Sequence, residues 1–181
     1  VRDAILSGWI TTGPRTKKLE KEVAEFVGVE KAVCLNSQTA CAEMALRLLG
    51  VGEGDEVIVP AYTYTASASV VEHVGATIVF VDVQKDCLEM DYEALEKAIT
   101  PKTKAVIPVD LGGIPCDYDR IFAIVESKKE MFTPKTDLQK MIGRIAVCCD
   151  AAHAFGASSH GKMVGSIADF SSFSFHAVKN F

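Results

Sequence analysis

The sequence predicts an α/β fold with three layers, in which a mostly parallel β-sheet is covered by helices on both faces. Short apolar runs rich in β-branched residues recur between longer stretches with helical periodicity, the pattern typical of such a sheet. Turn and capping residues, as in "GVGEGD", separate the two kinds of segment. A chain of 181 residues, 49% of them hydrophobic, suits one domain with a single core.

Each predicted element follows from its local pattern. Six runs are predicted as strands: KAVCL (31–35), EVIVP (56–60), TIVFVDV (77–83), KAVIPV (104–109), RIAVCC (144–149) and FSSFSF (170–175). Helices are predicted near residues 16–27, 39–49, 64–74, 91–99 and 117–128. Asp91 is predicted to cap the fourth of these helices. The polar stretch 126–143, with its Thr-Pro break, is predicted to be a surface excursion.

Charge and hydropathy argue against several classes of partner. Nineteen basic side chains against twenty-four acidic ones give a net charge of −5, and no run supplies the basic patch that nucleic acid or an anionic membrane requires. The longest apolar runs are far too short to span a bilayer, and the first residues do not resemble a secretory signal. We therefore expect a cytoplasmic protein that binds neither membrane nor nucleic acid.

The six cysteines do not form CxxC pairs, which makes a zinc site or a disulfide framework the weaker interpretation. The adjacent pair Cys148 and Cys149 is predicted to point to opposite faces of a strand. Reduced, buried cysteines in a cytoplasmic protein are the expected state.

In an open parallel sheet, ligands bind at the carboxyl ends of the strands, so the polar residues that follow each predicted strand are the candidates for a site. Ser37 and Thr39 follow the first strand, where a capped helix begins. Its free N–H groups and these hydroxyls would suit a phosphate group, although an ordinary capped helix explains them equally well. Tyr62 and Tyr64 follow the second strand and could either stack on a planar ligand or pack at a helix start.

Two further candidates follow the last two strands. Asp150 ends an apolar strand, where a carboxylate needs a cationic or N–H partner, and His153 lies three residues further on. Asp150 could instead cap a helix, with His153 as a structural histidine. In "FSSFSFHAVKN", strand alternation places Ser172, Ser174 and His176 on one face, and Lys179 follows.

A lone lysine after a strand is usually a solvated charge, but four loops considered together indicate more. A phosphate cradle, an aromatic face, a buried carboxylate and a lysine match the requirements of pyridoxal 5'-phosphate (PLP). The carboxylate would keep the pyridine nitrogen protonated, and the Lys179 amine would bond to the aldehyde carbon.

The chain resembles the DegT/DnrJ/EryC1/StrS family of PLP-dependent sugar aminotransferases over nearly its whole length. The blocks that carry the resemblance are "SGWITTGPRTKKLEKEVAEFVGVEKAVCLNSQTA", "PAYTYTASA", "VDLGG", "CCDAAHAFGA" and "SFSFHAVKN". The resemblance implies the aspartate-aminotransferase fold, which is PLP fold type I. It further implies that residues 1–181 form a partial PLP-binding large domain, without the smaller C-terminal domain of the family.

The resemblance also implies a role for each candidate residue. Lys179 would be the catalytic lysine that bonds to PLP, and Asp150 would pair with the pyridine nitrogen. Tyr64 would stack on the ring and His153 would lie beside it. The expected phosphate contacts are Ser37, Gln38, Thr39 and Ser174. The family usually has glycine at the position of Gln38, so this contact is the one that departs from its pattern.

The implied activity moves an amino group from an amino acid, expected to be glutamate, to a nucleotide-linked keto sugar, in amino-sugar, cell-envelope or polysaccharide biosynthesis. Some relatives carry histidine in place of the lysine and act as sugar dehydratases, so Lys179 favours transamination. The family also implies a homodimer. Two alternatives stay open: a PLP-binding protein of this fold with a regulatory, non-catalytic role, and an α/β domain that binds a ligand other than PLP.

Overall fold

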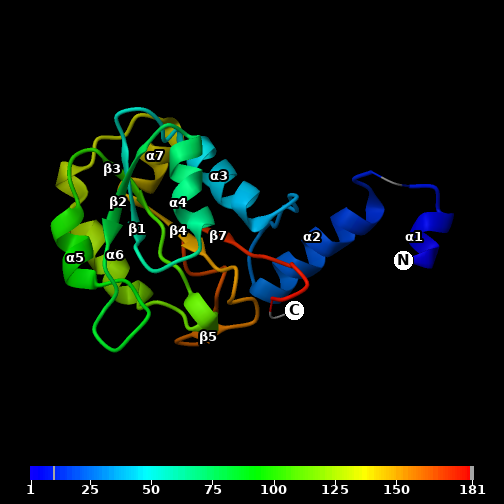
Figure 1. Ribbon diagram of the computed structural model, residues 1–181. Coiled ribbons are helices and arrows are strands. Elements are labelled where there is room, and N and C mark those ends of the chain that lie inside the picture. Colours follow the sequence, from blue (N-terminus) through cyan, green and yellow to red (C-terminus); the bar gives the residue numbers. More distant parts are fainter. Residues whose placement is uncertain (10, 180–181) are drawn as a thin grey trace.

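The computed structural model describes residues 1–9 and 11–179, and its centre is a parallel β-sheet (Figure 1). Neighbouring strands run in the order β2-β1-β3-β4-β7, and all four pairs are parallel. The strands are β1 (Glu56–Pro60), β2 (Thr77–Val81), β3 (Thr103–Val106), β4 (Ala146–Asp150) and β7 (Phe170–Ser172). A separate antiparallel pair is formed by β5 (Ser158–Ser159) and β6 (Lys162–Met163).

Seven α-helices lie in the described residues; the first and the last were not predicted, and the other five begin and end within two residues of their predicted bounds. They are α1 (Arg2–Leu6), α2 (Pro14–Val27), α3 (Gln38–Leu49), α4 (Thr65–His73), α5 (Tyr92–Ala98), α6 (Tyr118–Ser127) and α7 (Asp137–Ile142). Short 3₁₀ turns span Leu111–Gly113 and Lys129–Met131. Asp91 caps α5 as predicted, since its carboxylate accepts hydrogen bonds from the N–H groups of Glu93 and Ala94. None of the described helices is long and apolar enough to cross a membrane.

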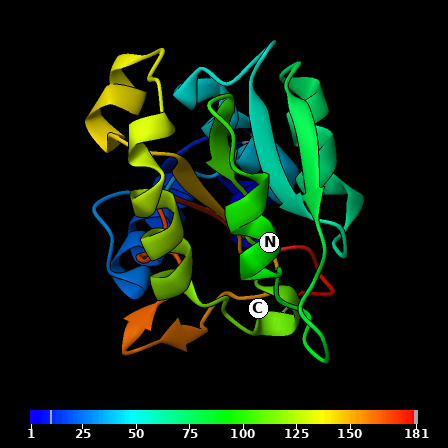
Figure 2. The ribbon, with the colours of Figure 1, turned by 90° about the vertical axis from the view of Figure 1, so that its left-hand side faces the viewer.

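Two apolar cores lie on opposite faces of the sheet, which confirms the predicted three layers. Residues of α3 and α4 pack with Val57 and Val59 of β1, whereas residues of α5 and α6 pack with Ile58. In Figure 2, α5 and α6 lie in front of the sheet. Cys148 belongs to the first core and Cys149 to the second, so the predicted opposite orientation of this pair is confirmed. All six cysteines are free thiols.

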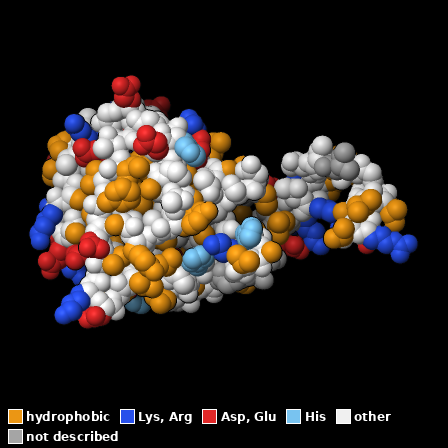
Figure 3. All heavy atoms as spheres, viewed as in Figure 1, with side chains coloured by type: hydrophobic (Ala, Val, Ile, Leu, Met, Phe, Trp, Pro, Cys, Tyr) orange, Lys and Arg blue, Asp and Glu red, His pale blue; other side chains and the backbone are white. Residues whose placement is uncertain are grey.

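Charge is distributed without a basic patch on the face shown in Figure 3. Lysine and arginine side chains there are interspersed with acidic ones, and hydrophobic side chains lie between them. Figure 1 shows that α1 lies apart from the body of the molecule.

Several of the predicted elements are wrong in part. The strands predicted at 77–83 and 104–109 end earlier, at Val81 and Val106. Segment 31–35 is not a strand, because no strand pairs with it within the described residues, and the N–H of Cys34 donates to Glu20 Oε1 instead. β7 ends at Ser172, three residues before the predicted end, and Phe173 and Phe175 each pack edge-on against the ring of Phe155. The stretch 126–143 contains the unpredicted helix α7.

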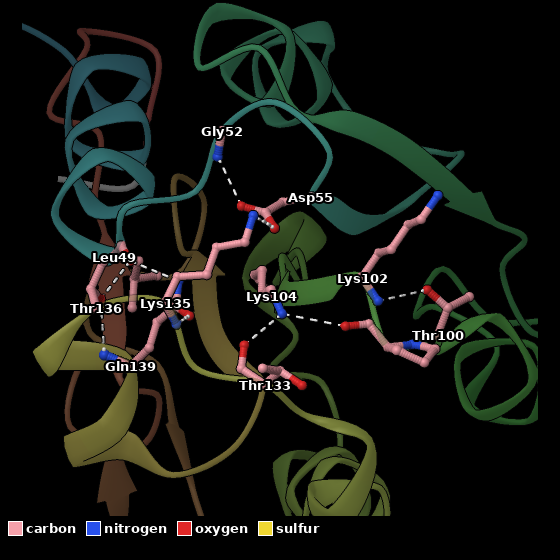
Figure 4. A network of polar contacts seen from close by, with 11 residues as sticks. Leu49, Gly52, Asp55, Thr100, Lys102, Lys104, Thr133, Lys135, Thr136 and Gln139 are labelled. Atoms are coloured by element: carbon pink, nitrogen blue, oxygen red, sulfur yellow. Dashed lines mark hydrogen bonds and ion pairs between the residues drawn. The ribbon is translucent and has the colours of Figure 1, made fainter.

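Buried polar contacts hold residues 128–143 against the amino-terminal edge of the sheet (Figure 4). The buried Lys104 donates through Nζ to the carbonyl of Thr133 at 2.8 Å, and the buried Asp55 pairs with Lys135 at 2.6 Å. Gln139, 1% exposed, donates through Nε2 to the carbonyl of Leu49 at 2.8 Å and accepts at Oε1 from the Lys135 N–H. This edge lies opposite the strand ends where a ligand is expected.

Replacing Gln139 with leucine is expected to lower the free energy of unfolding by about 1–3 kcal/mol, because the Lys135 N–H loses its buried acceptor. Urea unfolding would measure this loss. The control is Gln84→Leu, at a half-exposed position, which should change stability far less. Equal unfolding midpoints for wild type and Gln139→Leu would contradict the assigned role of this contact.

Candidate active site

One cavity of about 1180 Å³ opens at the carboxyl edge of the sheet. The eight residues singled out in the sequence all line it: Ser37, Gln38, Thr39, Tyr64, Asp150, His153, Ser174 and Lys179. They come from four separate stretches that follow different strands or precede different helices. The topology of the sheet brings these stretches to one edge, as the strand-end rule predicts.

Asp150 is the last residue of β4 and only 5% exposed. Its Oδ2 accepts a hydrogen bond from the Ser67 hydroxyl at 2.7 Å, and its Oδ1 accepts one from the Ala152 N–H at 3.1 Å. The carboxylate therefore has the donor partners that its burial requires. The helix-cap alternative is wrong, because turns rather than a helix follow Asp150.

Ser67 was missed by the sequence analysis. It lies in α4 and is fully buried, and its hydroxyl also lies 2.9 Å from the Thr63 hydroxyl. The only signal in the sequence is the spacing of four between Thr63 and Ser67, which places both on one side of a helix start. Nothing in that spacing points to Asp150, which is distant in the sequence.

Lys179 meets His153 inside the cavity. Its Nζ lies 2.7 Å from His153 Nε2, and the Lys179 side chain is half-buried. On the other side of the ring, the N–H of Gly112 donates to His153 Nδ1 at 3.2 Å. The amine is thus held at the site by a defined partner rather than extending into solvent.

The start of α3 supplies unpaired N–H donors. Ser37 caps this helix by accepting from the Ala40 N–H at 3.1 Å, as predicted. The Gln38 side chain points inward, where Nε2 donates to the hydroxyl of Ser172 at 2.9 Å. The Gln38 side chain therefore links α3 to β7. The backbone N–H groups of Gln38 and Thr39 lie in the first turn of α3, where no intrahelical acceptor is available to them. Such a turn favours an anion.

Tyr64 immediately precedes α4, and its ring is 76% exposed. Tyr62 is 58% exposed. The alternative in which these two tyrosines are packing residues at a helix start is therefore wrong. Tyr64 lines the cavity, whereas Tyr62 is not among the lining residues. Ser174 lies beyond β7 and also borders the cavity.

A buried polar cluster at the wall of the cavity was also missed. Asp110 is fully buried, and its Oδ1 accepts hydrogen bonds from the Cys116 N–H and the Tyr118 hydroxyl, each at 2.9 Å. The Cys149 thiol donates to its Oδ2 at 3.3 Å. Asp110 follows the run predicted as a strand at 104–109, so the rule that selected Asp150 could have selected it too.

Burial raises the pKa of Asp110, and the hydrogen bonds from its donors offset this only in part. A carboxyl group whose pKa is higher in the folded state stabilises the fold fully below its unfolded pKa, and that contribution is lost as the pH rises through the folded pKa. We therefore expect wild type to lose stability relative to Asp110→Asn as the pH rises from about 4.

Urea unfolding of wild type and Asp110→Asn between about pH 4 and pH 8 would measure this change. The exposed Asp137→Asn variant is the control, and its difference from wild type should vary much less with pH. A constant difference between wild type and Asp110→Asn would contradict the prediction.

The donor set of the cavity fits PLP. It offers helix-start N–H groups for a phosphate, an exposed tyrosine ring for a planar heterocycle, a buried carboxylate for a protonated ring nitrogen and an amine for an aldehyde. Within the described residues, no cluster of histidine, cysteine and acidic side chains could hold a metal ion.

Comparison with known proteins agrees with this fit. The sequence profile of the DegT/DnrJ/EryC1/StrS aminotransferase family matches residues 1–181. The spore coat polysaccharide biosynthesis protein SpsC of Bacillus subtilis (strain 168) is 41% identical over 180 residues, which cover 99% of this chain and 42% of SpsC.

Solved structures are similar as well. Spr1654 of Streptococcus pneumoniae, assigned as a sugar aminotransferase, is 60% identical in its PLP form, with a TM-score of 0.98 over 99% of this chain and 46% of Spr1654. A PMP form of Spr1654 matches equally well. The GDP-4-keto-6-deoxymannose-3-dehydratase ColD, with GDP-perosamine bound, is 25% identical with a TM-score of 0.80 over 95% of this chain and 42% of ColD. The chain thus spans less than half the length of these relatives.

Proposed function

Because the chain belongs to the DegT/DnrJ/EryC1/StrS aminotransferase family, we propose that it forms the cofactor-binding large domain of a PLP-dependent sugar aminotransferase. The observation that carries the proposal is the convergence of Lys179 and Asp150 on one cavity, with Lys179 Nζ 2.7 Å from His153. This pairing of an amine and a buried carboxylate is what the chemistry of PLP requires.

Each side chain has a part in holding the cofactor. Asp150, fixed by Ser67 and the Ala152 N–H, would keep a proton on the pyridine nitrogen. The first turn of α3 and Ser174 would bind the phosphate, and Tyr64 would cover one face of the ring. PLP, when bound, supplies a ring that withdraws electrons from the carbon attached to the reacting amine.

Lys179 would act in both halves of the exchange. Its amine would hold the cofactor by bonding to the aldehyde, and once the amino group of the donor has displaced it, the freed Nζ would take a proton from the α carbon of the donor. In the second half, Nζ would return a proton to the sugar carbon that receives the amino group. His153, in contact with Nζ, orients it for both transfers.

For the substrates we propose a nucleotide-linked keto sugar and an amino acid donor, glutamate in the first instance. SpsC acts in polysaccharide biosynthesis by its name, and ColD was solved with a GDP-linked sugar, which supports the sugar class. A cytoplasmic homodimer is the proposed setting.

The decisive experiment follows the amino group. Purified protein, supplied with PLP, ¹⁵N-glutamate and a panel of nucleotide-linked keto sugars, should yield an amino sugar that carries the label. Borohydride should fix the cofactor on Lys179. Fixation without transfer from any donor would favour a regulatory PLP protein, and the absence of fixation would overturn the proposal in favour of a different ligand.

A further inference from the structure

The two ring nitrogens of His153 each have a hydrogen-bond partner. Two groups contact its ring: the Gly112 N–H, 3.2 Å from Nδ1, and Lys179 Nζ, 2.7 Å from Nε2. We propose that the loop 110–116 fixes His153 in the tautomer with its proton on Nε2, so that His153 donates to Lys179 and the lysine presents a lone pair.

The donors and acceptors around the His153 ring determine where its proton lies. A backbone N–H can only donate, so His153 Nδ1 must be the unprotonated nitrogen. A neutral imidazole then carries its proton on Nε2 and donates there. A protonated Lys179 has no lone pair to accept this hydrogen bond, whereas the free amine has one. A single placement of protons satisfies both contacts.

Asp110 holds the loop that directs the Gly112 N–H toward His153. Its buried carboxylate accepts from the Cys116 N–H and thereby closes the loop that contains Gly112. The backbone N–H of Asp110 also donates to the carbonyl of Asp150 at 3.1 Å, which ties the loop to β4. Asp110 is therefore proposed as a positioning residue, which acts through Gly112 on His153.

Gly113 shows how closely the loop and His153 fit. It has a φ of +81°, and a Cβ at this position would lie 2.9 Å from the His153 carbonyl oxygen. An alanine there would be strained by its backbone conformation and would push the loop and His153 apart. The close contact between the loop and His153 thus requires a residue without a side chain at position 113.

The consequence for chemistry rests on the proposed function. An amine that bonds to an aldehyde must present its lone pair, and an ammonium group cannot. By donating from Nε2, His153 would favour the reactive form of Lys179 before the cofactor arrives.

The test measures the ring directly. In cofactor-free protein labelled with ¹⁵N-histidine, long-range ¹H–¹⁵N spectra at neutral pH distinguish protonated from unprotonated ring nitrogens, and His153→Gln identifies the His153 signals. We expect Nδ1 to be unprotonated and Nε2 protonated. Asp110→Asn should shift the ring toward a mixture of tautomers, while the exposed control Asp137→Asn should leave it unchanged.

Gly113→Ala gives the same comparison if Asp110→Asn fails to fold. A wild-type ring protonated at Nδ1, or an unchanged ring in a folded Asp110→Asn or Gly113→Ala variant, would overturn the inference. Failure of the proposed function is a separate result, because labelled amino transfer can be absent while the tautomer is as inferred. Equally, active enzyme with Nδ1 protonated would overturn the inference alone.

Discussion

Lys179→Ala is expected to abolish both the absorbance band of covalently bound PLP and the transfer of an amino group. The physical reason is that alanine removes the nucleophile, the base and the contact with His153 together. Loss of amino transfer should exceed about 10³-fold, since the two roles are lost at once. The fold should persist, because Lys179 is only half-buried and lies outside both apolar cores.

Lys162→Ala is the matched control for this substitution. Lys162 is an exposed lysine of β6, away from the cavity, so its removal should leave both the absorbance band and the transfer rate near the wild-type values. Absorbance spectra with added PLP and transfer from glutamate would be compared across the three proteins. Superimposable spectra for wild type and Lys179→Ala would refute covalent attachment at this residue.

The fold was predictable where the pattern is local. β1 matches its predicted bounds, because its consecutive apolar residues are buried against both cores. Segment 31–35 has the same apolar, β-branched character and still is not a strand within the described chain. A strand requires a neighbour to hydrogen-bond with, and the sequence of a segment does not encode whether that neighbour is adjacent. Helix α7 was missed because it is short and only half apolar, with Gln139 rather than an apolar residue at its buried position.

The candidate site was predictable to the extent that strand ends converge. Ser37, Tyr64, Asp150 and Lys179 are chemically distinctive residues at or beyond the ends of helices and strands, and all line the cavity. Ser67 was not predictable, because a serine inside a helix is ordinary until the fold places it 2.7 Å from a carboxylate. The contact between Gly112 and His153 depends on a backbone N–H, which every residue except proline offers.

Asp150→Asn is expected to leave PLP bound and to lower the rate of amino transfer by about 10²- to 10³-fold, the loss typical of removing one electrostatic contact to the reacting group. The amide keeps the shape of the carboxylate but not its charge, so it cannot hold a proton on the ring nitrogen. A steady-state assay with glutamate would record the rate, and urea unfolding would check that the fold is retained.

Ser67→Ala separates the charge of Asp150 from its orientation. This variant removes the 2.7 Å hydrogen bond but leaves the carboxylate ionisable and still bonded to the Ala152 N–H. Its rate should therefore fall by less than that of Asp150→Asn, because a charge that is slightly misplaced still attracts a proton on the ring nitrogen, whereas a neutral amide does not. If Ser67→Ala were as slow as Asp150→Asn, orientation rather than charge would be the property of Asp150 on which the reaction depends. If neither variant slowed the reaction, Asp150 would have no part in it.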